Sequence, residues 1–326
     1  MNAELPYARL GPDLILAAVE SVGCECDGRI IALASYENRV YQLGSSDGFI
    51  VAKFYRPDRW SDEAILEEHR FALELAEAEI PVVPPMVLGG ATLHEHEGYR
   101  FAVFERRGGR WPELATAAER GQMGRLIARI HAIGGRERFR HRASLSIEAL
   151  GWRSVETLEQ SGFIPPHLSA SYHAIAVDVL EAVERRFEAA GGYSELRIHG
   201  DCHPGNVLWT DAGPHFVDLD DCMNGPAVQD LWLFLSGSRD EMTVQLADLL
   251  EGYRQFRDFD YRELHLIEAL RSLRMIHYNA WIARRWRDPA FPRAFPWFTE
   301  PKHWEEHVLA LREQRAAVDE PPLFVG

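Results

Sequence analysis

The chain has 326 residues, 46% of them hydrophobic and 26% charged, which is an ordinary composition for a globular protein large enough to form two lobes. Its formal net charge of -15 argues against a nucleic-acid binder and against docking on anionic membranes, because both partners require surfaces rich in lysine and arginine. The sequence has no run of about 18 apolar residues and no basic segment followed by an apolar run at its start, so we expect neither a transmembrane helix nor a signal peptide. Four cysteines without the spacing of a zinc site are typical of a reducing compartment.

The first third of the chain predicts a mixture of helices and strands. Two amphipathic segments predict helices over residues 12–22 and 62–78, and Ser61 is a suitable N-cap for the second helix. Short runs rich in β-branched and aromatic residues predict strands at residues 30–33, 40–43, 49–54, 87–88 and 99–104. This part of the chain is therefore expected to form a small sheet with helices beside it.

The chain becomes mostly helical after the segment 106–110, which is rich in arginine and glycine and interrupts the pattern. Apolar periodicity predicts helices at residues 113–132, 166–190, 229–235, 241–256, 261–285 and 302–317. Short apolar runs between these helices predict strands at residues 196–198, 206–209 and 215–217. We therefore expect an α+β fold with a small sheet-rich lobe over residues 1–104 and a larger, mainly helical lobe over residues 105–326.

The most informative polar residues lie in the segment 199–206, which reads His-Gly-Asp-Cys-His-Pro-Gly-Asn, and at Asp218, which ends an apolar run. Protein kinases use the same spacing of an aspartate, an amide and a second aspartate to hold Mg-ATP and a hydroxyl nucleophile. Asp201 would accept the proton of the attacking hydroxyl. Asn206 and Asp218 would supply the oxygen ligands that Mg²⁺ prefers. The motif predicts ATP-dependent phosphoryl transfer, with Asp201 and Asp218 as catalytic residues, in a bilobal protein-kinase-like fold.

A surface hairpin with solvated acids is the alternative explanation of these residues, because an aspartate in a loop rich in glycine and proline is usually a turn former or a cap. The complete set, with its spacing and its neighbouring strands, favours phosphoryl transfer. Asp220 and Asp221 follow the motif and are expected to be solvated loop acids. Asp230 starts a predicted helix, and we expect it to brace the loop that carries Asp201.

Lys53 is a single cation inside the apolar strand 49–54. It resembles the lysine of protein kinases that contacts the α- and β-phosphates, although a strand-edge lysine facing solvent would be the more common arrangement. Kinases pair this lysine with a glutamate on the helix that follows, and both Glu67 and Glu68 lie on the predicted helix. Adjacent helical residues point about 100° apart, so at most one of the two can face inward. We expect Glu68 to be the partner of Lys53.

The sequence has no glycine-rich phosphate loop and has Ala-Ser-Tyr-Glu-Asn-Arg-Val-Tyr at residues 34–41 in its place. Ser35 and Asn38 could offer donors to phosphate, and an ordinary polar hairpin accounts for the same residues equally well. Glu105 ends the segment that has the place of the hinge, where backbone groups would bind the edge of adenine. Glu105 would therefore contribute its main chain to the nucleotide site.

Two other groups of residues are expected to be structural. The tryptophans of the C-terminal region are predicted to pack in the core rather than to form a substrate platform, since large aromatic side chains are mostly buried. These residues are Trp281, Trp286, Trp297 and Trp304. Cys202 and Cys222 lie beside the proposed acids, and inert buried thiols are expected there rather than a redox switch.

Several strings of residues resemble the bacterial stress response kinase A family, in the aminoglycoside phosphotransferase-like branch of the kinase fold. They are Ser-Tyr-Glu-Asn-Arg-Val-Tyr-Gln at 35–42, Lys-Phe-Tyr-Arg-Pro at 53–57, the motif at 199–206 and the stretch 218–232. The resemblance covers nearly the whole chain. It implies a cytoplasmic, monomeric serine/threonine protein kinase that uses Mg-ATP, autophosphorylates and acts in stress responses. It also implies a proton acceptor at Asp201, Mg²⁺ ligands at Asn206 and Asp218, and an ATP site that includes Ser35.

The same residues fit a kinase that acts on the hydroxyl of a small molecule such as an aminoglycoside, choline or homoserine. Asp201 can accept a proton from any hydroxyl, so the motif does not separate the two classes of acceptor. A non-catalytic nucleotide-binding module is disfavoured, because Lys53 and the three residues of the motif are all present. The expected partners are ATP, Mg²⁺ and a protein serine or threonine, with no nucleic acid and no membrane.

Overall fold

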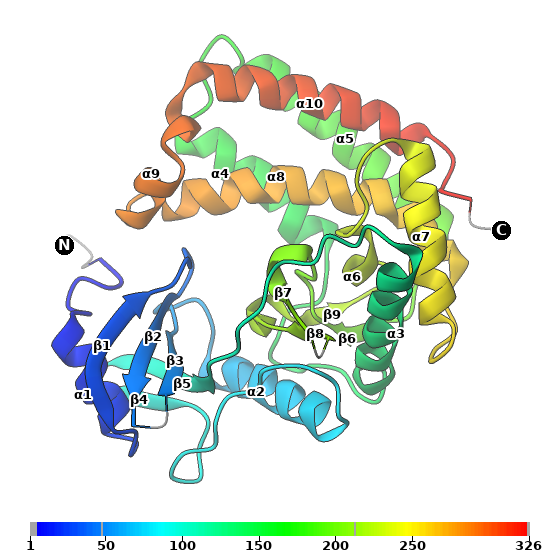
Figure 1. The fold of residues 1–326 in the computed structure, drawn as a ribbon. Coiled ribbons are helices and arrows are strands. Elements are labelled where there is room, and N and C mark those ends of the chain that lie inside the picture. Colours follow the sequence, from blue (N-terminus) through cyan, green and yellow to red (C-terminus); the bar gives the residue numbers. More distant parts are fainter. Residues whose placement is uncertain (1–4, 47, 212, 325–326) are drawn as a thin grey trace.

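The computed structural model describes residues 5–46, 48–211 and 213–324, and it begins with a five-stranded antiparallel sheet (Figure 1). The strands lie in the order β1 (Cys26–Ala32), β2 (Arg39–Ser45), β3 (Gly48–Phe54), β5 (Tyr99–Glu105) and β4 (His94–His96). Lys53 in β3 lies opposite Val40 on one side and Ala102 on the other. This central position keeps the Lys53 side chain buried, which excludes a solvent-facing lysine at the edge of the sheet.

Two helices accompany the sheet. Helix α1 (Pro12–Glu20) packs Ile15 and Val19 into an apolar cluster with residues of β2, β3 and β5. Helix α2 (Asp62–Glu77) begins at the predicted N-cap, where the Ser61 side chain accepts a hydrogen bond from the N–H of Ala64 at 3.2 Å. Figure 1 shows α2 between the sheet and the rest of the chain, so its residues can contact both.

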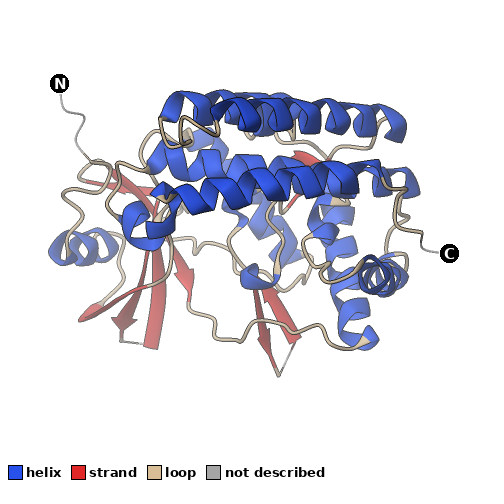
Figure 2. Cartoon of the chain, turned by 90° about the horizontal axis from the view of Figure 1, so that it is seen from above, coloured by secondary structure: helices blue, strands red, loops and turns tan. Residues whose placement is uncertain are grey.

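The C-terminal two thirds of the chain are mainly helical. The helices are α3 (Ala117–Gly134), α4 (Arg153–Ser161), α5 (Ser169–Ala190), α6 (Gln229–Trp232), α7 (Arg239–Tyr253), α8 (Ile267–Arg285), α9 (Ala290–Ala294) and α10 (Pro301–Asp319). Figure 2 shows the long helices lying side by side and the five-stranded sheet apart from the strands of the helical part. Among the described residues, no helix is both long enough and apolar enough to cross a bilayer.

Two small antiparallel strand pairs lie within the helical part. One pair joins β6 (Leu196–Ile198) to β9 (Met223–Gly225), and the other joins β7 (Val207–Thr210) to β8 (Gly213–Phe216). The loops that leave β6 and β8 carry the aspartates of the predicted motif. The two pairs therefore bring residues 201 and 218 to the same region of the molecule.

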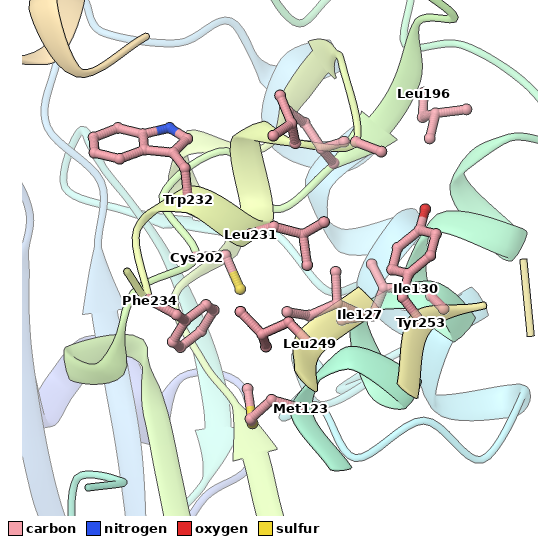
Figure 3. Packing of buried hydrophobic residues seen from close by; sticks show 14 of the residues in the cluster. Met123, Ile127, Ile130, Leu196, Cys202, Leu231, Trp232, Phe234, Leu249 and Tyr253 are labelled. Atoms are coloured by element: carbon pink, nitrogen blue, oxygen red, sulfur yellow. The ribbon is translucent and has the colours of Figure 1, made fainter. Parts of the chain in front are cut away.

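The largest apolar cluster includes side chains from these strand pairs and from the helices around them (Figure 3). Cys202 and Leu231 pack there against side chains of α3 and α7, among them Ile127 and Leu249. Helices α3 and α7 approach each other closely because Gly124 lies against the backbone of α7, where any Cβ would overlap the carbonyl of Leu249. The loop that carries Asp201 thus starts from a buried apolar base.

The predicted fold class is confirmed, with an antiparallel sheet first and helices after it. The strand predicted at residues 87–88 is wrong: Leu88 makes only an isolated bridge to Ala91, and the fifth strand is β4, whose His-Glu-His sequence carries no apolar signal. Helix α4 was not predicted. Strand β5 runs through Glu105, across the boundary expected after residue 104, and the division into two lobes at that point stays a prediction.

Candidate nucleotide and phosphoryl-transfer site

The loop after β6 is held in place by the buried carboxylate of Asp230, at the start of α6. The backbone N–H groups of His199 and Gly200 donate to its two oxygens at 2.7 and 2.8 Å. The His131 ring nitrogen Nε2 lies 3.0 Å from the same carboxylate. Asp230 thus braces the segment that leads to Asp201, as the sequence predicted.

Gly200 occupies a position that other residues cannot take without strain. Its φ of 84° lies in the left-handed region that favours glycine. A Cβ at this position would also overlap the backbone carbonyl of Asp221 in the loop after β8. The glycine of the motif therefore lets the loop that carries Asp201 and the loop after β8 lie against each other.

Asp201 faces two basic side chains. Its Oδ1 lies 2.5 Å from Nη1 of Arg274 in α8, and its Oδ2 lies 3.4 Å from Nε2 of His203. Burial favours the neutral acid, but the contacts with His203 and Arg274 outweigh burial and hold the pKa of the Asp201 carboxyl well below its usual range. The group is therefore an ionised carboxylate at neutral pH, which is the form that accepts a proton.

Arg274 was missed by reasoning from the sequence. It stands on an amphipathic helix, 73 residues after Asp201, and no spacing rule connects the two. An arginine exposed on a helix face is ordinarily a solvated residue. The signal that identifies it is spatial and becomes available only when α8 is placed beside the catalytic loop.

Asn206 and Asp218 lie side by side. The Val217 N–H donates to the backbone carbonyl of Asn206 at 3.0 Å. The Asn206 Nδ2 donates to the carbonyl of Asp201 at 3.0 Å, which leaves its side-chain oxygen as the group available for a ligand. Asp218 has a left-handed backbone conformation, with φ of 59° and ψ of 64°, and an accessible carboxylate. Such strain in a non-glycine residue is typical of functional sites.

Lys53 joins the sheet to three carboxylates. Its Nζ lies 3.3 Å from Glu68, 3.3 Å from Asp218 and 3.0 Å from Asp220. Burial alone would lower the pKa of Lys53, but the carboxylates of Asp220, Glu68 and Asp218 raise it well above its ordinary value. The lysine is therefore a cation at neutral pH beside the loop 218–222.

The two glutamates of α2 have different partners. Glu68 is the partner of Lys53, as expected, and burial raises the pKa of its carboxyl. Glu67 is buried as well, so the expectation that at most one of the two glutamates faces inward is wrong. Its carboxylate accepts backbone N–H groups of the segment 140–142 instead of pairing with Lys53. The 100° rotation between neighbouring helical residues thus separates the two roles.

The expectation that Asp220 is solvated is wrong. Its carboxylate is almost fully buried and pairs with Lys53 and with Arg59, which follows β3. Burial opposes ionisation, but the cations Arg59, Lys53 and Arg142 hold the pKa of Asp220 well below its usual range. Asp221 also contacts Arg59, at 2.5 Å. The pairing of Arg59 with these acids spans more than 160 residues of sequence, so no local pattern revealed it.

The loop between β1 and β2 carries the two residues predicted as phosphate donors. The Ser35 hydroxyl donates to the carbonyl of Asn38 at 3.2 Å. The Asn38 side chain is buried and accepts the N–H of Arg56 at 3.1 Å. Asn38 thus orders the loop in this structure, and Ser35 is the partly exposed member of the pair.

Glu105 lies at the end of β5, away from the carboxylates. Its exposed side chain pairs with Arg107 at 2.6 Å. Downstream, the N–H of Arg110 donates to the carbonyl of Trp209 at 3.0 Å, so the connection between the two parts of the chain runs beside β7. That the main chain of Glu105 binds adenine stays a prediction.

The cysteines and tryptophans agree with structural roles. Cys202 and Cys222 are buried, and burial raises the pKa of both thiols, so neither forms a thiolate readily. Trp304 is fully buried, and Trp281, Trp286 and Trp297 pack around its cluster. Core packing was the favoured prediction for these aromatic residues.

Comparison of the sequence with known proteins gives consistent results. The family described as "Phosphotransferase enzyme family" matches residues 29–267. Stress response kinase A of Escherichia coli strain K12 is 42% identical over 323 residues, which cover 99% of this chain and 98% of that protein. The serine/threonine protein kinase RdoA of Salmonella typhimurium is 41% identical over 318 residues, which cover 97% and 96%.

Solved structures share the fold at low sequence identity. An amicoumacin kinase, hAmiN, solved with AMP-PNP, Ca²⁺ and Ami, superposes with a TM-score of 0.70 at 17% identity and covers 95% of each chain. A microcompartment-associated aminopropanol kinase has a TM-score of 0.69 at 18% identity and covers 96% of this chain and 100% of that one. These similarities establish the kinase-like fold.

Proposed function

The chain belongs to the phosphotransferase enzyme family, among the stress response kinase A proteins, and from this premise we propose that it is an ATP- and Mg-dependent serine/threonine protein kinase. We propose further that it autophosphorylates and acts in a stress response as a cytoplasmic monomer. The observation that carries the proposal is the meeting of Lys53, Asp201, Asn206 and Asp218 between the sheet and the strand pairs. The nucleotide lobe would comprise residues 1–104 and the acceptor lobe residues 105–326.

The donor set fits a magnesium ion. Mg²⁺ prefers hard oxygen ligands and takes only one or two carboxylates from protein, which matches the free oxygen of Asn206 and the accessible carboxylate of Asp218. When bound with ATP, the ion offsets the charge of the phosphates. Lys53 would contact the nucleotide phosphates, and Glu68 would hold Lys53 in place. Ser35 would lie at the ATP site, and the backbone of Glu105 would bind adenine.

Asp201 would take the proton of the acceptor hydroxyl as the hydroxyl oxygen bonds to the γ-phosphorus of ATP and the bond from that phosphorus to ADP breaks. Its carboxylate is ionised, and one of its oxygens is already fixed by Arg274. A fixed and ionised base can receive the proton without reorientation at the moment of reaction. The loose transition state of phosphoryl transfer requires little more from the protein than this positioning and charge compensation.

A protein acceptor is favoured over a small-molecule one by the relatives of higher identity. The proteins at 41–42% identity are named stress response kinase A and a serine/threonine protein kinase. The structures named for small-molecule substrates share only 17–18% of their residues with this chain, a level that indicates the fold alone. The small-molecule hydroxyl kinase is therefore the second candidate and an outcome of the test.

The test is incubation of the purified chain with radiolabelled Mg-ATP, alone and with cell extract, followed by mass spectrometry of phosphosites. Label in the chain itself and on serine or threonine of extract proteins is the expected result, and Asp201→Asn is the control, in which the rate of transfer should fall by about 10²- to 10⁴-fold. Chelation of Mg²⁺ should abolish the signal. Turnover of aminoglycosides, choline or homoserine without label in any protein would instead support the small-molecule kinase.

A further inference from the structure

The segment between α3 and α4 connects helix α2 to the metal-binding loop, and the proposed function leaves it without a role. The backbone N–H groups of residues 140–142 donate to the two oxygens of Glu67 at 2.8, 2.8 and 3.1 Å. Three consecutive donors on one carboxylate fix this segment to α2. Both carboxylate oxygens of Glu67 accept these hydrogen bonds, and Glu68 is the glutamate that pairs with Lys53.

Arg142 extends from this anchor into the interior, where its side chain is completely shielded from solvent. On the side of α2, Nη1 donates to the carbonyl of Ala64 at 3.2 Å and lies 3.5 Å from Glu68. On the side of the metal-binding loop, Nε donates to the carbonyl of Cys222 at 2.6 Å and Nη2 donates to the carbonyl of Asp220. One guanidinium thus contacts both elements that hold Lys53.

The chemistry of arginine suits this bridging position. The guanidinium carries five donors in one rigid plane, so a single side chain can fix two elements at a set separation. The ring of Trp60 lies over the Arg142 guanidinium, with 4.3 Å between the ring centroid and Cζ, and adds a cation–π contact. Without the guanidinium, the buried carbonyl oxygens and Glu68 would lose the hydrogen bonds that Arg142 donates. Buried polar groups without partners lower the free energy of unfolding.

The loop 218–222 requires such support. Asp218 has the left-handed backbone conformation described above, and strain of this kind persists only where the surroundings hold it in place. In protein kinases the lysine–glutamate pair and the metal-binding aspartate must both be in place, and phosphorylation of an activation loop controls this. In this protein Arg142, from the segment beside α2, contacts both α2 and the loop 218–222.

We propose that Arg142 is a positioning residue, which holds Glu68 and the loop 218–222 in the arrangement for phosphoryl transfer without prior phosphorylation. The inference rests on the proposed kinase function. It follows that this kinase is active as folded.

The experiment compares Arg142→Met and Arg142→Lys with the matched variant Arg197→Met. Arg197 is equally buried, lies over the ring of Phe71 at 4.7 Å and pairs with Glu74 of α2 at 2.7 Å, but it does not contact the loop 218–222. Thermal melting gives the stability of each variant, and steady-state kinetics give kcat, the KM for ATP and the Mg²⁺ concentration for half-maximal activity.

Loss of a residue that supports metal ligands typically costs about 10- to 100-fold in activity or metal affinity. We therefore expect folded Arg142→Met to have a lower kcat than wild type and to need at least about tenfold more Mg²⁺ for half-maximal activity. Arg142→Lys should have values between those of Arg142→Met and wild type. Arg197→Met should lose stability with its Mg²⁺ requirement unchanged. Wild-type kinetics in folded Arg142 variants, or the same kinetic changes in Arg197→Met, would overturn the inference. If Arg142→Met does not fold, Arg142→Lys decides by the same criteria.

A second measurement separates this inference from the function on which it rests. Wild-type protein treated with phosphatase, and then freed of it, should transfer phosphate from Mg-ATP from the first turnover, without a lag. A lag removed by prior incubation with ATP would overturn the claim of activity without phosphorylation. Wild-type protein that transfers no phosphate to any acceptor would refute the proposed kinase function instead.

Discussion

Single residues of the catalytic loop are fixed by backbone conformation as much as by side-chain chemistry. Gly200 has a positive φ and lies directly against the carbonyl of Asp221. A side chain at this position would be disfavoured both by the backbone conformation and by overlap with that carbonyl. Gly200→Ala should displace Asp201 from its position, and a displacement of about 1 Å in an active site can cost about a hundredfold in rate. We expect kcat to fall by roughly that factor in a protein that remains folded.

The matched control for this substitution is Gly191→Ala at the end of α5. Gly191 has a φ of 67°, but a Cβ there would meet open space. That variant should lose about 1 kcal/mol of stability with unchanged kcat. Equal kinetics for the two alanine variants would show that the contact between Gly200 and Asp221 has no part in the reaction.

The role of Asp201 gives the sharpest prediction for a side chain. Asp201→Asn keeps the shape of the residue but removes the carboxylate that would accept the proton, and general base catalysis contributes about 10²- to 10⁴-fold. We expect kcat to fall within that range while the KM for ATP stays within a few fold of wild type. Asp260→Asn is the control, because Asp260 also pairs with an arginine, Arg262, at 2.6 Å and lies outside the site. Wild-type turnover in Asp201→Asn would contradict the assignment.

At the scale of whole elements, the loop between β1 and β2 is tied to the C-terminal helices. Glu37 accepts the indole N–H of Trp281 at 2.6 Å and pairs with Arg285, both on α8, and it also pairs with Arg56 at 3.0 Å. Asp288, just before α9, pairs with the same Arg56 at 2.6 Å. Helices that are distant in sequence therefore hold the loop that carries Ser35.

Glu37→Gln tests whether this tie serves the nucleotide site. Removal of one partner from a buried ion pair costs about 3 kcal/mol, because the remaining charges stay buried. We expect lower stability together with a KM for ATP raised several fold, since the loop of Ser35 loses its attachment. Glu268→Gln removes a half-buried carboxylate that contacts Arg271 on the same helix, away from the site, and should change stability alone. An unchanged KM for ATP in folded Glu37→Gln would exclude a role of the tie in nucleotide binding.

The elements differ in how far sequence alone could predict them. Strands β2, β3 and β5 were predicted to within a few residues because their runs are rich in β-branched and aromatic residues. The cluster of Asp201, Asn206 and Asp218 was predictable because its members lie on two adjacent loops with fixed spacing. The arginines that pair with the acids of the site could not be predicted. Arg59 lies 161 residues from Asp220 in the sequence, and Arg274 lies 73 residues from Asp201. Such ion pairs depend on how elements pack, which leaves no periodic signal.

At the scale of the whole molecule, buried histidines connect stability to pH. Burial lowers the pKa of His69, His277 and His307 to about 3 each, so all three are neutral in the folded state. An unfolded histidine has a pKa of about 6.5, so unfolding takes up protons below that pH. Their contribution to stability is present above pH 6.5 and is lost as the pH falls below it. Glu263 acts in the opposite direction, because burial raises its pKa to about 7.

His307→Gln isolates one of these contributions. His307 is buried in α10 beside Asn279 and the ring of Tyr172, so the variant should be less stable than wild type at pH 7.5. Below pH 6.5 only wild type loses the contribution of this histidine, by about 1.4 kcal/mol for each pH unit. The stability difference between the two proteins should therefore shrink by about 1 kcal/mol between pH 6.5 and 5.5, since the unfolded histidine is already half protonated at pH 6.5, as measured by urea unfolding. His167→Gln, on an exposed ring, should keep the wild-type pH dependence. A difference that stays constant over this range would show that His307 is protonated in the folded protein as readily as in the unfolded one.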